Sequence, residues 1–200
     1  MKTLPEKTAT LFLTCLVALA ITGYAYSHWT DTATIFGTAK MAHLEITIDD
    51  QKLIPDIGYT KNPTNKTITI SAPITPAWQI WVGIIIKNKG TVPVTITQKI
   101  TTTNQPYESY FGNETYFYGP YTTVPPEVWC DLNQTNPPPT GGKTPPIDLP
   151  VGDKLVVWQK IWLKNPLPTE FAGIIITSEY FATFSGWHDT VAVIYHLYKE

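Results

Sequence analysis

Hydrophobic and polar residues alternate through much of the chain after residue 41, which is the pattern of a strand with one buried face. In residues 42–49, for example, four hydrophobic side chains alternate with four polar ones. Further strands are predicted at residues 67–70, 78–88, 92–102, 155–164, 171–184 and 191–198. Seven or more such strands, joined by Gly, Pro and Asn turns, predict an all-β fold. We expect a jelly-roll-like two-sheet sandwich in which each sheet has one buried and one solvated face.

Residues 105–150 break this pattern, because ten of the 18 prolines of the chain fall within them. Proline cannot donate to a β ladder, so we expect a long surface insertion there and no central strand. Its aromatic residues are Tyr107, Tyr110, Phe111, Tyr116, Phe117, Tyr118 and Tyr121. They indicate either a hairpin whose rings pack on the sandwich or an exposed platform for subunit contacts or sugar stacking. Cys130 is expected to be a buried small hydrophobe, with an intermolecular disulfide as the alternative.

Residues 1–25 are typical of a secretory signal peptide. Two lysines precede an uncharged, mainly apolar stretch from residue 8 to residue 26. Small residues place the cleavage site after Ala25, or after Ser27 two residues later. An uncleaved membrane anchor and the assembly helix of a type IV pilin are alternative interpretations of the same stretch. Cleavage would remove one of the two cysteines, so the exported chain, with its main domain at residues 41–200, would have no internal disulfide.

Charged residues make up only 15% of the chain, against about a quarter in a typical soluble domain. All 14 basic residues are lysines, and the formal net charge is −2. Both facts argue against nucleic-acid binding, since nucleic-acid readers rely on arginine forks and basic stripes. Threonine, with 31 residues, takes the place of many of the missing charged residues, and it favours β-strands. A chain with so few charges also has little electrostatic repulsion between its own copies.

The sequence contains no recognisable catalytic or metal-binding motif. Its four histidines include no HExxH and no other paired ligand spacing. Asp49, Asp50 and Asp153 are too few acidic residues for a calcium site, which takes six or more oxygens. Residues 185–189 include a serine and a histidine, yet no GxSxG surrounds the serine, and a turn between two strands is the better interpretation. We therefore expect no enzymatic activity, no metal and no cofactor.

Three sequons are compatible with a glycosylated surface. Their asparagines are Asn65, Asn113 and Asn133. Because a three-residue pattern is common by chance, the sequence makes these asparagines candidates and nothing more.

The segment between the signal and the domain, residues 26–40, is too polar for a core strand and too rich in β-branched and aromatic residues for a disordered tail. Such a segment becomes a strand by pairing with a sheet edge, since strand addition satisfies main-chain groups whatever the sequence. If the edge belongs to a neighbouring copy, the contact is head-to-tail and propagates into a filament. The predicted donor strand consists of His28, Trp29, Thr30, Asp31, Thr32, Ala33, Thr34, Ile35 and Phe36. Trp29, Ala33 and Ile35 form its expected inward face, with Phe36 the rival if the register slips by one residue.

Several short motifs follow one another along the chain. They are His28-Trp29-Thr30-Asp31, Ile35-Phe36-Gly37-Thr38-Ala39, Leu44-Glu45-Ile46, the turn at residues 87–94, Val151-Gly152-Asp153 and Tyr180-Phe181-Ala182-Thr183. Together they resemble the TasA/camelysin family of biofilm-fibre proteins, and the chain is similar above all to the archaeal bundling pilins. The resemblance implies jelly-roll subunits that polymerise when the N-terminal strand of one subunit inserts into the next. Some proteins of that family are labelled metallopeptidases, but without HExxH this activity is not expected here.

We therefore expect a pilin, a secreted structural subunit of an extracellular filament at the cell surface, which polymerises by donor-strand complementation for adhesion and biofilm formation. Its expected partners are further copies of itself, arranged head to tail, with possible lateral contacts between filaments. No nucleic acid is expected, and a membrane only through the signal segment. The main alternative is a cell-surface carbohydrate-binding module that uses the aromatic residues of the insertion, and a third hypothesis is a cryptic metallopeptidase.

Overall fold

The structure, a computed structural model, describes residues 13–21, 42–103, 105–130 and 141–199. The predicted donor strand, both predicted cleavage sites and Asn133 lie outside these residues. The chain divides into two compact units, Met1–Met41 and Ala42–Glu200. In the first unit, residues 13–21 are helical with exposed side chains. Within the part of the chain that is described, no helix is both long and apolar enough to span a membrane.

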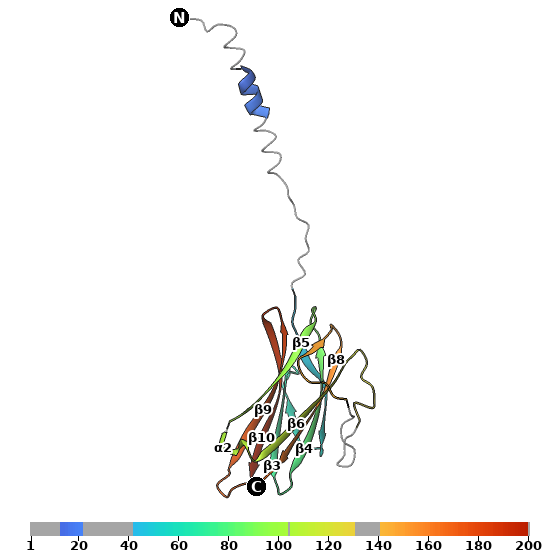
Figure 1. The fold of residues 1–200 in the computed structure, drawn as a ribbon, viewed down its shortest axis with the longest axis vertical. Coiled ribbons are helices and arrows are strands. Elements are labelled where there is room, and N and C mark those ends of the chain that lie inside the picture. Colours follow the sequence, from blue (N-terminus) through green and yellow to red (C-terminus); the bar gives the residue numbers. More distant parts are fainter. Residues whose placement is uncertain (1–12, 22–41, 104, 131–140, 200) are drawn as a thin grey trace, which may run out of the picture. The chain divides into compact units, whose positions relative to one another are not determined.

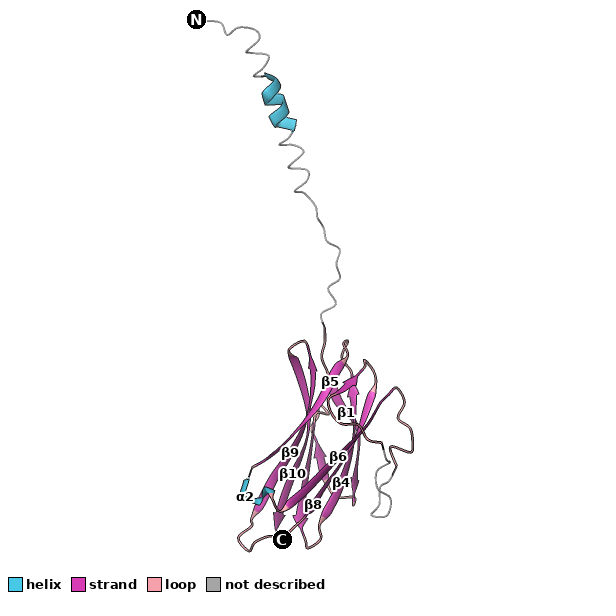
Figure 2. Cartoon of the chain, in the orientation of Figure 1, coloured by secondary structure: helices cyan, strands magenta, loops and turns pink. Residues whose placement is uncertain are grey.

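Two β-sheets make up the second unit (Figures 1 and 2). The first sheet has four antiparallel strands, in the spatial order β1 (Ile46–Ile54), β4 (Gln79–Asn88), β8 (Lys154–Leu163) and β6 (Phe111–Tyr121). The second sheet has the order β2 (Tyr59–Lys61), β3 (Thr67–Ile74), β10 (Trp187–Lys199), β9 (Gly173–Phe184), β5 (Val94–Thr102) and β7 (Ile147–Leu149). Only the β3–β10 pair is parallel among the described ladders. The predicted all-β two-sheet sandwich is confirmed, whereas its jelly-roll connectivity stays a prediction.

The main core lies between the two sheets and follows the predicted alternation closely. In β4 the inward residues are Ile80, Val82, Ile84 and Ile86, and in β10 they are Val191, Val193, Tyr195 and Leu197. All eight are at most 2% exposed. At this level of burial each aliphatic side chain stabilises the fold by about 1.5–3 kcal/mol.

One polar residue, Gln159 of β8, is also buried in this core and connects the sheets. Its Nε2 donates to Ser178 Oγ of β9 at 2.7 Å, and Tyr195 Oη of β10 donates to its Oε1 at 2.8 Å. Burial raises the pKa values of Tyr195 and Tyr180 well above the ordinary value. Because a buried amide is costly unless it is satisfied, these bonds fix how the two sheets face each other.

The outer face of the first sheet differs from the prediction that each sheet has one solvated face. β4 and β8 are buried on both faces, because the chain after β6, residues 122–130, lies across them. We name the resulting group the outer-face cluster; its buried members are Trp81, Ile85, Tyr118, Val128, Val156 and Trp158. The indole of Trp158 is anchored there, since its Nε1 donates to Val128 O at 3.0 Å. The prediction was wrong for this sheet because a covering loop is invisible to strand periodicity.

The proline-rich insertion also contains more regular structure than expected. Its first part forms the short helix α2 (Gln105–Glu108) and the whole of β6, an edge strand that pairs with β8 over most of its length. The register with β8 shifts between Tyr118 and Tyr121, where Pro120 lies. The prediction of a surface excursion is therefore wrong for residues 111–121, and also for the short strand β7 at residues 147–149. Aromatic and β-branched residues favour a strand at residues 111–121, and most of the prolines come after it.

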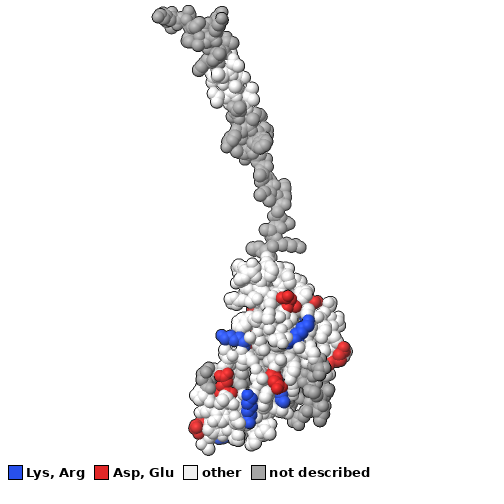
Figure 3. Space-filling view, viewed as in Figure 1, with Lys and Arg blue, Asp and Glu red and all other residues white. Residues whose placement is uncertain are grey.

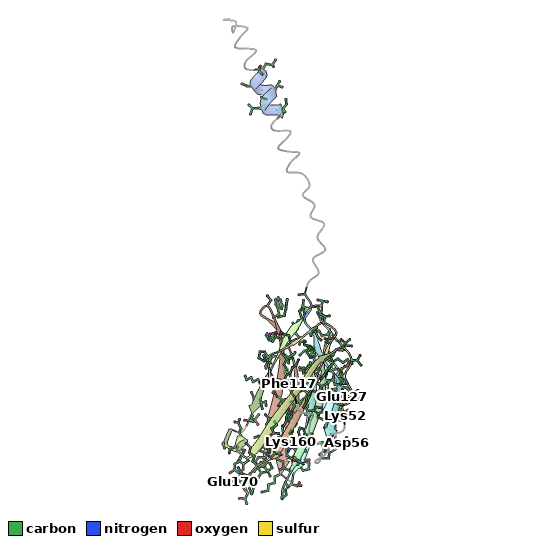
Figure 4. All side chains as sticks on the ribbon, turned by 45° about the vertical axis from the view of Figure 1, so that its right-hand side comes forward. Lys52, Asp56, Phe117, Glu127, Lys160 and Glu170 are labelled. Atoms are coloured by element: carbon green, nitrogen blue, oxygen red, sulfur yellow. The ribbon has the colours of Figure 1, made fainter. Side chains whose placement is uncertain are left out.

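The two ends of the sandwich carry different turns. The entry end is where the chain enters β1 at Ile46, and it carries the turns from β4 to β5, from β7 to β8 and from β9 to β10. The far end carries the turn from β3 to β4, the connection from β8 to β9 and the C-terminal end of β10. Glu170, labelled in Figure 4, lies at the far end, where the label C stands in Figure 1.

Candidate strand-accepting edge

The chain just before β1 is held firmly at the entry end. Lys89 N and Gly90 N donate to Glu45 O at 2.8 and 3.1 Å, and Thr91 N donates to His43 O at 2.8 Å. A Cβ atom at Gly90 would lie only 2.4 Å from His43 O, so no other residue fits this close approach without a backbone shift. The segment that precedes the domain therefore leaves it from a defined point.

Asn88, at the end of β4, ties together the turns around that point. Its side chain is buried; Nδ2 donates to Val92 O at 2.9 Å and to Leu149 O at 3.1 Å, while Oδ1 accepts from Gly90 N at 2.9 Å. A fully satisfied buried amide of this kind stabilises a turn without competing for water. The entry end is consequently a rigid surface.

The sandwich has open sheet edges, and the longest unprotected one belongs to β5. β7 pairs only with residues 94–96 of β5, so within the described chain no strand pairs with Thr97–Thr102 on the side away from β9. Thr103 N donates to Ile175 O of β9, and main-chain groups alternate in direction along a strand. The main-chain N–H and C=O groups of Gln98, Ile100 and Thr102 therefore point outward. We name residues 97–102 the β5 edge.

The other open edges carry features that discourage strand addition. β1 has a register shift between Ile48 and Asp50, next to the charged pair Asp49-Asp50. The exposed end of β3 contains Pro73, which has no N–H to donate. β6 has its own register shift and is bridged at Phe117 by Lys143, whose N donates to Phe117 O at 2.7 Å. The β5 edge has no proline and no register shift, and Lys99 is its single charge.

Across the gap from the β5 edge lies β6, and the two strands are joined by side chains. Gln98 Nε2 of β5 donates to Thr115 Oγ1 of β6 at 3.1 Å, while Asn113 Oδ1 of β6 accepts from Gln159 Nε2 of β8, its neighbour in the same sheet, at 2.8 Å. Ile100 is half-buried and packs against the main core from the same edge. This side of the sandwich thus combines free main-chain groups with an apolar residue that is only partly covered.

The aromatic residues of the insertion do not form an exposed platform. Phe117 is buried in the main core, and Tyr118 belongs to the outer-face cluster, where burial raises its pKa to about 12. Tyr107 packs edge-on against Phe171 with ring centroids 5.1 Å apart. Tyr116 is half-buried, 6.1 Å from the ring of Trp81. The packed interpretation of these rings is confirmed, except that they do not form a separate hairpin: Tyr107 lies in α2, and the rings from Phe111 to Tyr121 lie on the edge strand β6.

The sequence did not predict a stacked group beside them on β4 and β8. Lys160, labelled in Figure 4, places its Nζ 5.4 Å from the ring centroid of Trp81 and 5.2 Å from that of Trp162. These distances are those of cation–π contacts. The signal that could have found this group is the spacing of Lys160 and Trp162 on alternate positions of one strand, which places both on the same face.

The other predicted sites have ordinary surroundings. His43, His188 and His196 are exposed, and the described residues contain no group of three or more His, Cys, Asp or Glu side chains that could hold a metal ion. The turn between β9 and β10 is confirmed, with positive φ at Ser185 and Gly186.

The remaining candidates of the insertion and the sequons lie at the surface or near it. Cys130 is half-buried against the outer-face cluster, and its Sγ lies 3.4 Å from Glu127 O. Asn65 is half-buried in a turn with φ of 55°, and Asn113 is exposed on β6. Both asparagines are within the described chain, and their glycosylation stays a prediction.

Comparisons with known proteins add little to this picture. No protein-family model matches the sequence, and no curated protein matches it. Among solved structures, the N-terminal domain of PorA is 14% identical, with a TM-score of 0.38 over 77% of this chain and 96% of that one. A family 123 glycoside hydrolase from Clostridium perfringens is 11% identical, with a TM-score of 0.41 over 79% of this chain and 27% of that one. Similarities of this size support no conclusion about function.

Proposed function

We propose that this protein is a secreted structural subunit of an extracellular filament at the cell surface, without catalytic activity or cofactor. In this proposal residues 28–36 of one copy pair as a strand with the β5 edge of the next copy. The observation that carries it is the free β5 edge, the one long open edge in the described chain that neither proline nor a register shift protects. The resemblance to donor-strand filament proteins supports the same assignment.

The size of the β5 edge suits the predicted donor. Six residues of strand span about 20 Å at a rise of about 3.3 Å per residue, so a donor of nine residues covers the edge with some to spare. β7 already pairs with the first part of β5 and sets the line along which an added strand continues. Each ladder hydrogen bond contributes about 0.5–1.5 kcal/mol net. Several such bonds hold two copies together without a covalent link.

The side chains of the donor add to this main-chain pairing. On alternate positions, Trp29, Ala33 and Ile35 would face the interior, beside the half-buried Ile100, and Asp31 falls on the same face. Burying a side chain such as Ile35 contributes about 1.5–3 kcal/mol. Copies stack with little repulsion, because charged side chains are sparse and of both signs on the face shown in Figure 3.

Removal of the donor strand is the first test. The mature chain beginning at Tyr26 is compared with a chain beginning at Ala39, at the same concentration, by electron microscopy and size-exclusion chromatography. Filaments are expected from the first chain and a less stable monomer from the second, because the second lacks the strand that completes its neighbour. Filaments formed by the chain beginning at Ala39 would refute the proposal.

A matched pair of charges tests the donor register. Ile35→Asp replaces an aliphatic side chain of the expected inward face with a second carboxylate besides Asp31 and should abolish filaments, whereas Thr34→Asp places the carboxylate on the outward face and should leave them intact. If Thr34→Asp and Phe36→Asp abolish filaments and Ile35→Asp does not, the register of the donor differs by one residue from the one proposed. Filaments that survive all three substitutions would contradict donor-strand assembly.

A second matched pair tests the acceptor. Ile100→Pro removes an N–H that points away from β9, so the domain keeps its own ladder but loses a donor for the added strand. Ile100→Ala removes the same side chain and keeps the N–H. We expect the proline variant to stop elongation and the alanine variant to weaken it only. Circular dichroism of both monomers checks that they fold, and equal elongation by the two variants would assign the acceptor elsewhere.

A further inference from the structure

The turn between β9 and β10 carries two exposed aromatic side chains at the entry end. Trp187 is 75% exposed, and Phe184, across the ladder from it, is 37% exposed. The two residues between them, Ser185 and Gly186, have positive φ angles of 48° and 84°, as in the two-residue turns of tight β-hairpins. We name residues 184–187 the hairpin tip. Trp187 is thus largely exposed, whereas Phe184 lines a shallow hollow beside Pro93 and Asp148. A large exposed apolar side chain such as Trp187 usually marks a contact site.

An apolar cleft of about 430 Å³ opens at the far end of the same domain. Its apolar walls come from the turn after β3 and from the connection after β8, and include Ile74, Pro76, Leu163, Pro166 and Leu167. Lys164 and Lys199 also line it. The cleft is large enough for an indole ring, and prolines on both sides give it stiff walls.

The hairpin tip and the cleft lie at opposite ends of one sandwich, so a domain cannot fill its own cleft with its own tip. A second copy, related head to tail, brings the two together. Such a contact is heterologous and does not close, so it repeats from copy to copy. It also follows the direction in which the proposed donor strand would connect successive copies.

The hairpin tip and the cleft are chemically complementary. A lysine ammonium beside an indole forms a favourable cation–π contact, which this protein already uses where Lys160 lies 5.4 Å from the ring of Trp81. Lys164 and Lys199 both line the cleft that an indole would enter, and Lys199 Nζ also donates to Pro168 O and Thr169 O, each at 3.4 Å. Asp148, exposed beside the tip, adds a negative charge on the complementary side.

We propose that the hairpin tip of each copy packs into the far-end cleft of the next copy, with Trp187 as the anchor, and forms a second head-to-tail contact beside the donor strand. This inference rests on the proposed function for its biological setting, but the contact itself is independent of the donor strand. It gives each junction two attachment points. Two points fix the twist between neighbouring copies, which a single strand does not.

Substitutions at each surface test the contact in filaments. Trp187→Ser should raise the concentration needed for filament growth about tenfold, since a buried aromatic anchor is lost. Its matched control is Val151→Ser, which also removes an exposed apolar side chain at the entry end. Thr75→Trp fills the cleft and should act like Trp187→Ser, whereas Thr169→Trp, at the same end but outside the cleft, should not. Filament growth unchanged by Trp187→Ser and by Thr75→Trp overturns the inference.

Cysteine cross-linking separates this contact from donor-strand pairing. The mature full chain carries Ile35→Asp, which disables the proposed donor, and Cys130→Ser, which removes the native thiol. His188→Cys with Asn165→Cys should then give a ladder of disulfide-linked oligomers at high concentration, because these positions flank the tip and the cleft. Val151→Cys with Asn165→Cys is the control. A ladder from the first pair alone supports the contact whether or not the donor-strand proposal holds. The absence of a ladder, or equal ladders from both pairs, would overturn the proposed contact. So would the finding that another protein, and not the cleft of the next copy, covers the Trp187 side chain.

Discussion

The domain has two hydrophobic clusters, and they are built differently. The main core is mostly aliphatic and draws its members from nine strands of both sheets. The outer-face cluster has six buried members, three of them aromatic, and depends on residues 122–130 to cover it. In the main core each side chain is enclosed by two sheets whose ladders hold them in place. In the outer-face cluster one wall is a loop that main-chain ladders do not fix.

Polar anchors compensate for the missing ladder on the outer face. Trp158 Nε1 donates to Val128 O at 3.0 Å, and Trp129 Nε1 donates to Asp50 Oδ2 at 3.1 Å. Lys52 Nζ donates to Trp129 O at 3.3 Å. Indole rings suit this role, since each offers a large apolar surface and one N–H that must find an acceptor. The apolar residues enclosed by two sheets therefore define the fold. The outer-face cluster is held by a few hydrogen bonds, and its covering loop can shift more easily than a sheet can.

Two neighbouring residues of β4 test this difference directly. Ile84 points into the main core and Ile85 into the outer-face cluster, at 1% and 5% exposure. Ile84→Ala should destabilise the fold by about 3–5 kcal/mol, and Ile85→Ala by about 2 kcal/mol, because a loop settles into a cavity more easily than a sheet does. Unfolding in urea measures both values. Equal losses, or a larger loss for Ile85→Ala, would show that the loop is as rigid as the sheets.

Gly83 of β4 lies against the indole rings of Trp158 and Trp129, and replacing it should give the second largest loss of stability. A Cβ atom at Gly83 would lie 2.7 Å from the ring of Trp158 and 2.9 Å from that of Trp129. Gly83→Ala should therefore cost about 1–3 kcal/mol by overpacking and shift the tryptophan emission spectrum, since both rings must move. Gly58→Ala is the control, because a Cβ atom there meets nothing within 4 Å. A Gly83→Ala variant as stable as the Gly58→Ala variant would mean that the loop yields freely.

The two clusters also differ in how well the sequence predicts them. Strict alternation in residues 191–198 predicted the inward face of β10, because one side of that strand meets the core and the other meets solvent. Residues 81–86 read instead as an unbroken apolar run, which is typical of a strand buried on both faces. A prediction based on their alternate positions alone therefore misses the outer face. What covers that face is set by the path of residues 122–130, which no local pattern encodes.

The candidate acceptor lay beyond prediction for a related reason. β5 was predicted close to its observed bounds, yet its free edge exists because β7 is only three residues long. A strand of three residues is too short to show a period, and the prolines around it indicated a loop. The donor residues are predicted from their own alternation, and they lie outside the described chain. A sequence pattern therefore suggested a donor, while the matching edge required the pairing of strands far apart in the chain.

Alkaline titration gives the smallest expected effect and compares the clusters through their tyrosines. Burial raises the pKa of Tyr118 from 10.0 to about 12, and the pKa values of Tyr180 and Tyr195 in the main core are raised further. A raised pKa means that the folded state favours the neutral phenol, so this contribution to stability is complete below about pH 10 and is lost as the pH rises through about 12. Tyr118→Phe should therefore reduce the loss of stability between pH 10 and 12, while the core tyrosines ionise only when the domain unfolds. Tyrosinate absorbance, followed beside circular dichroism, separates the two groups. If Tyr118→Phe leaves the pH dependence unchanged, or if the core tyrosines titrate before unfolding, the main core is no better enclosed than the outer-face cluster.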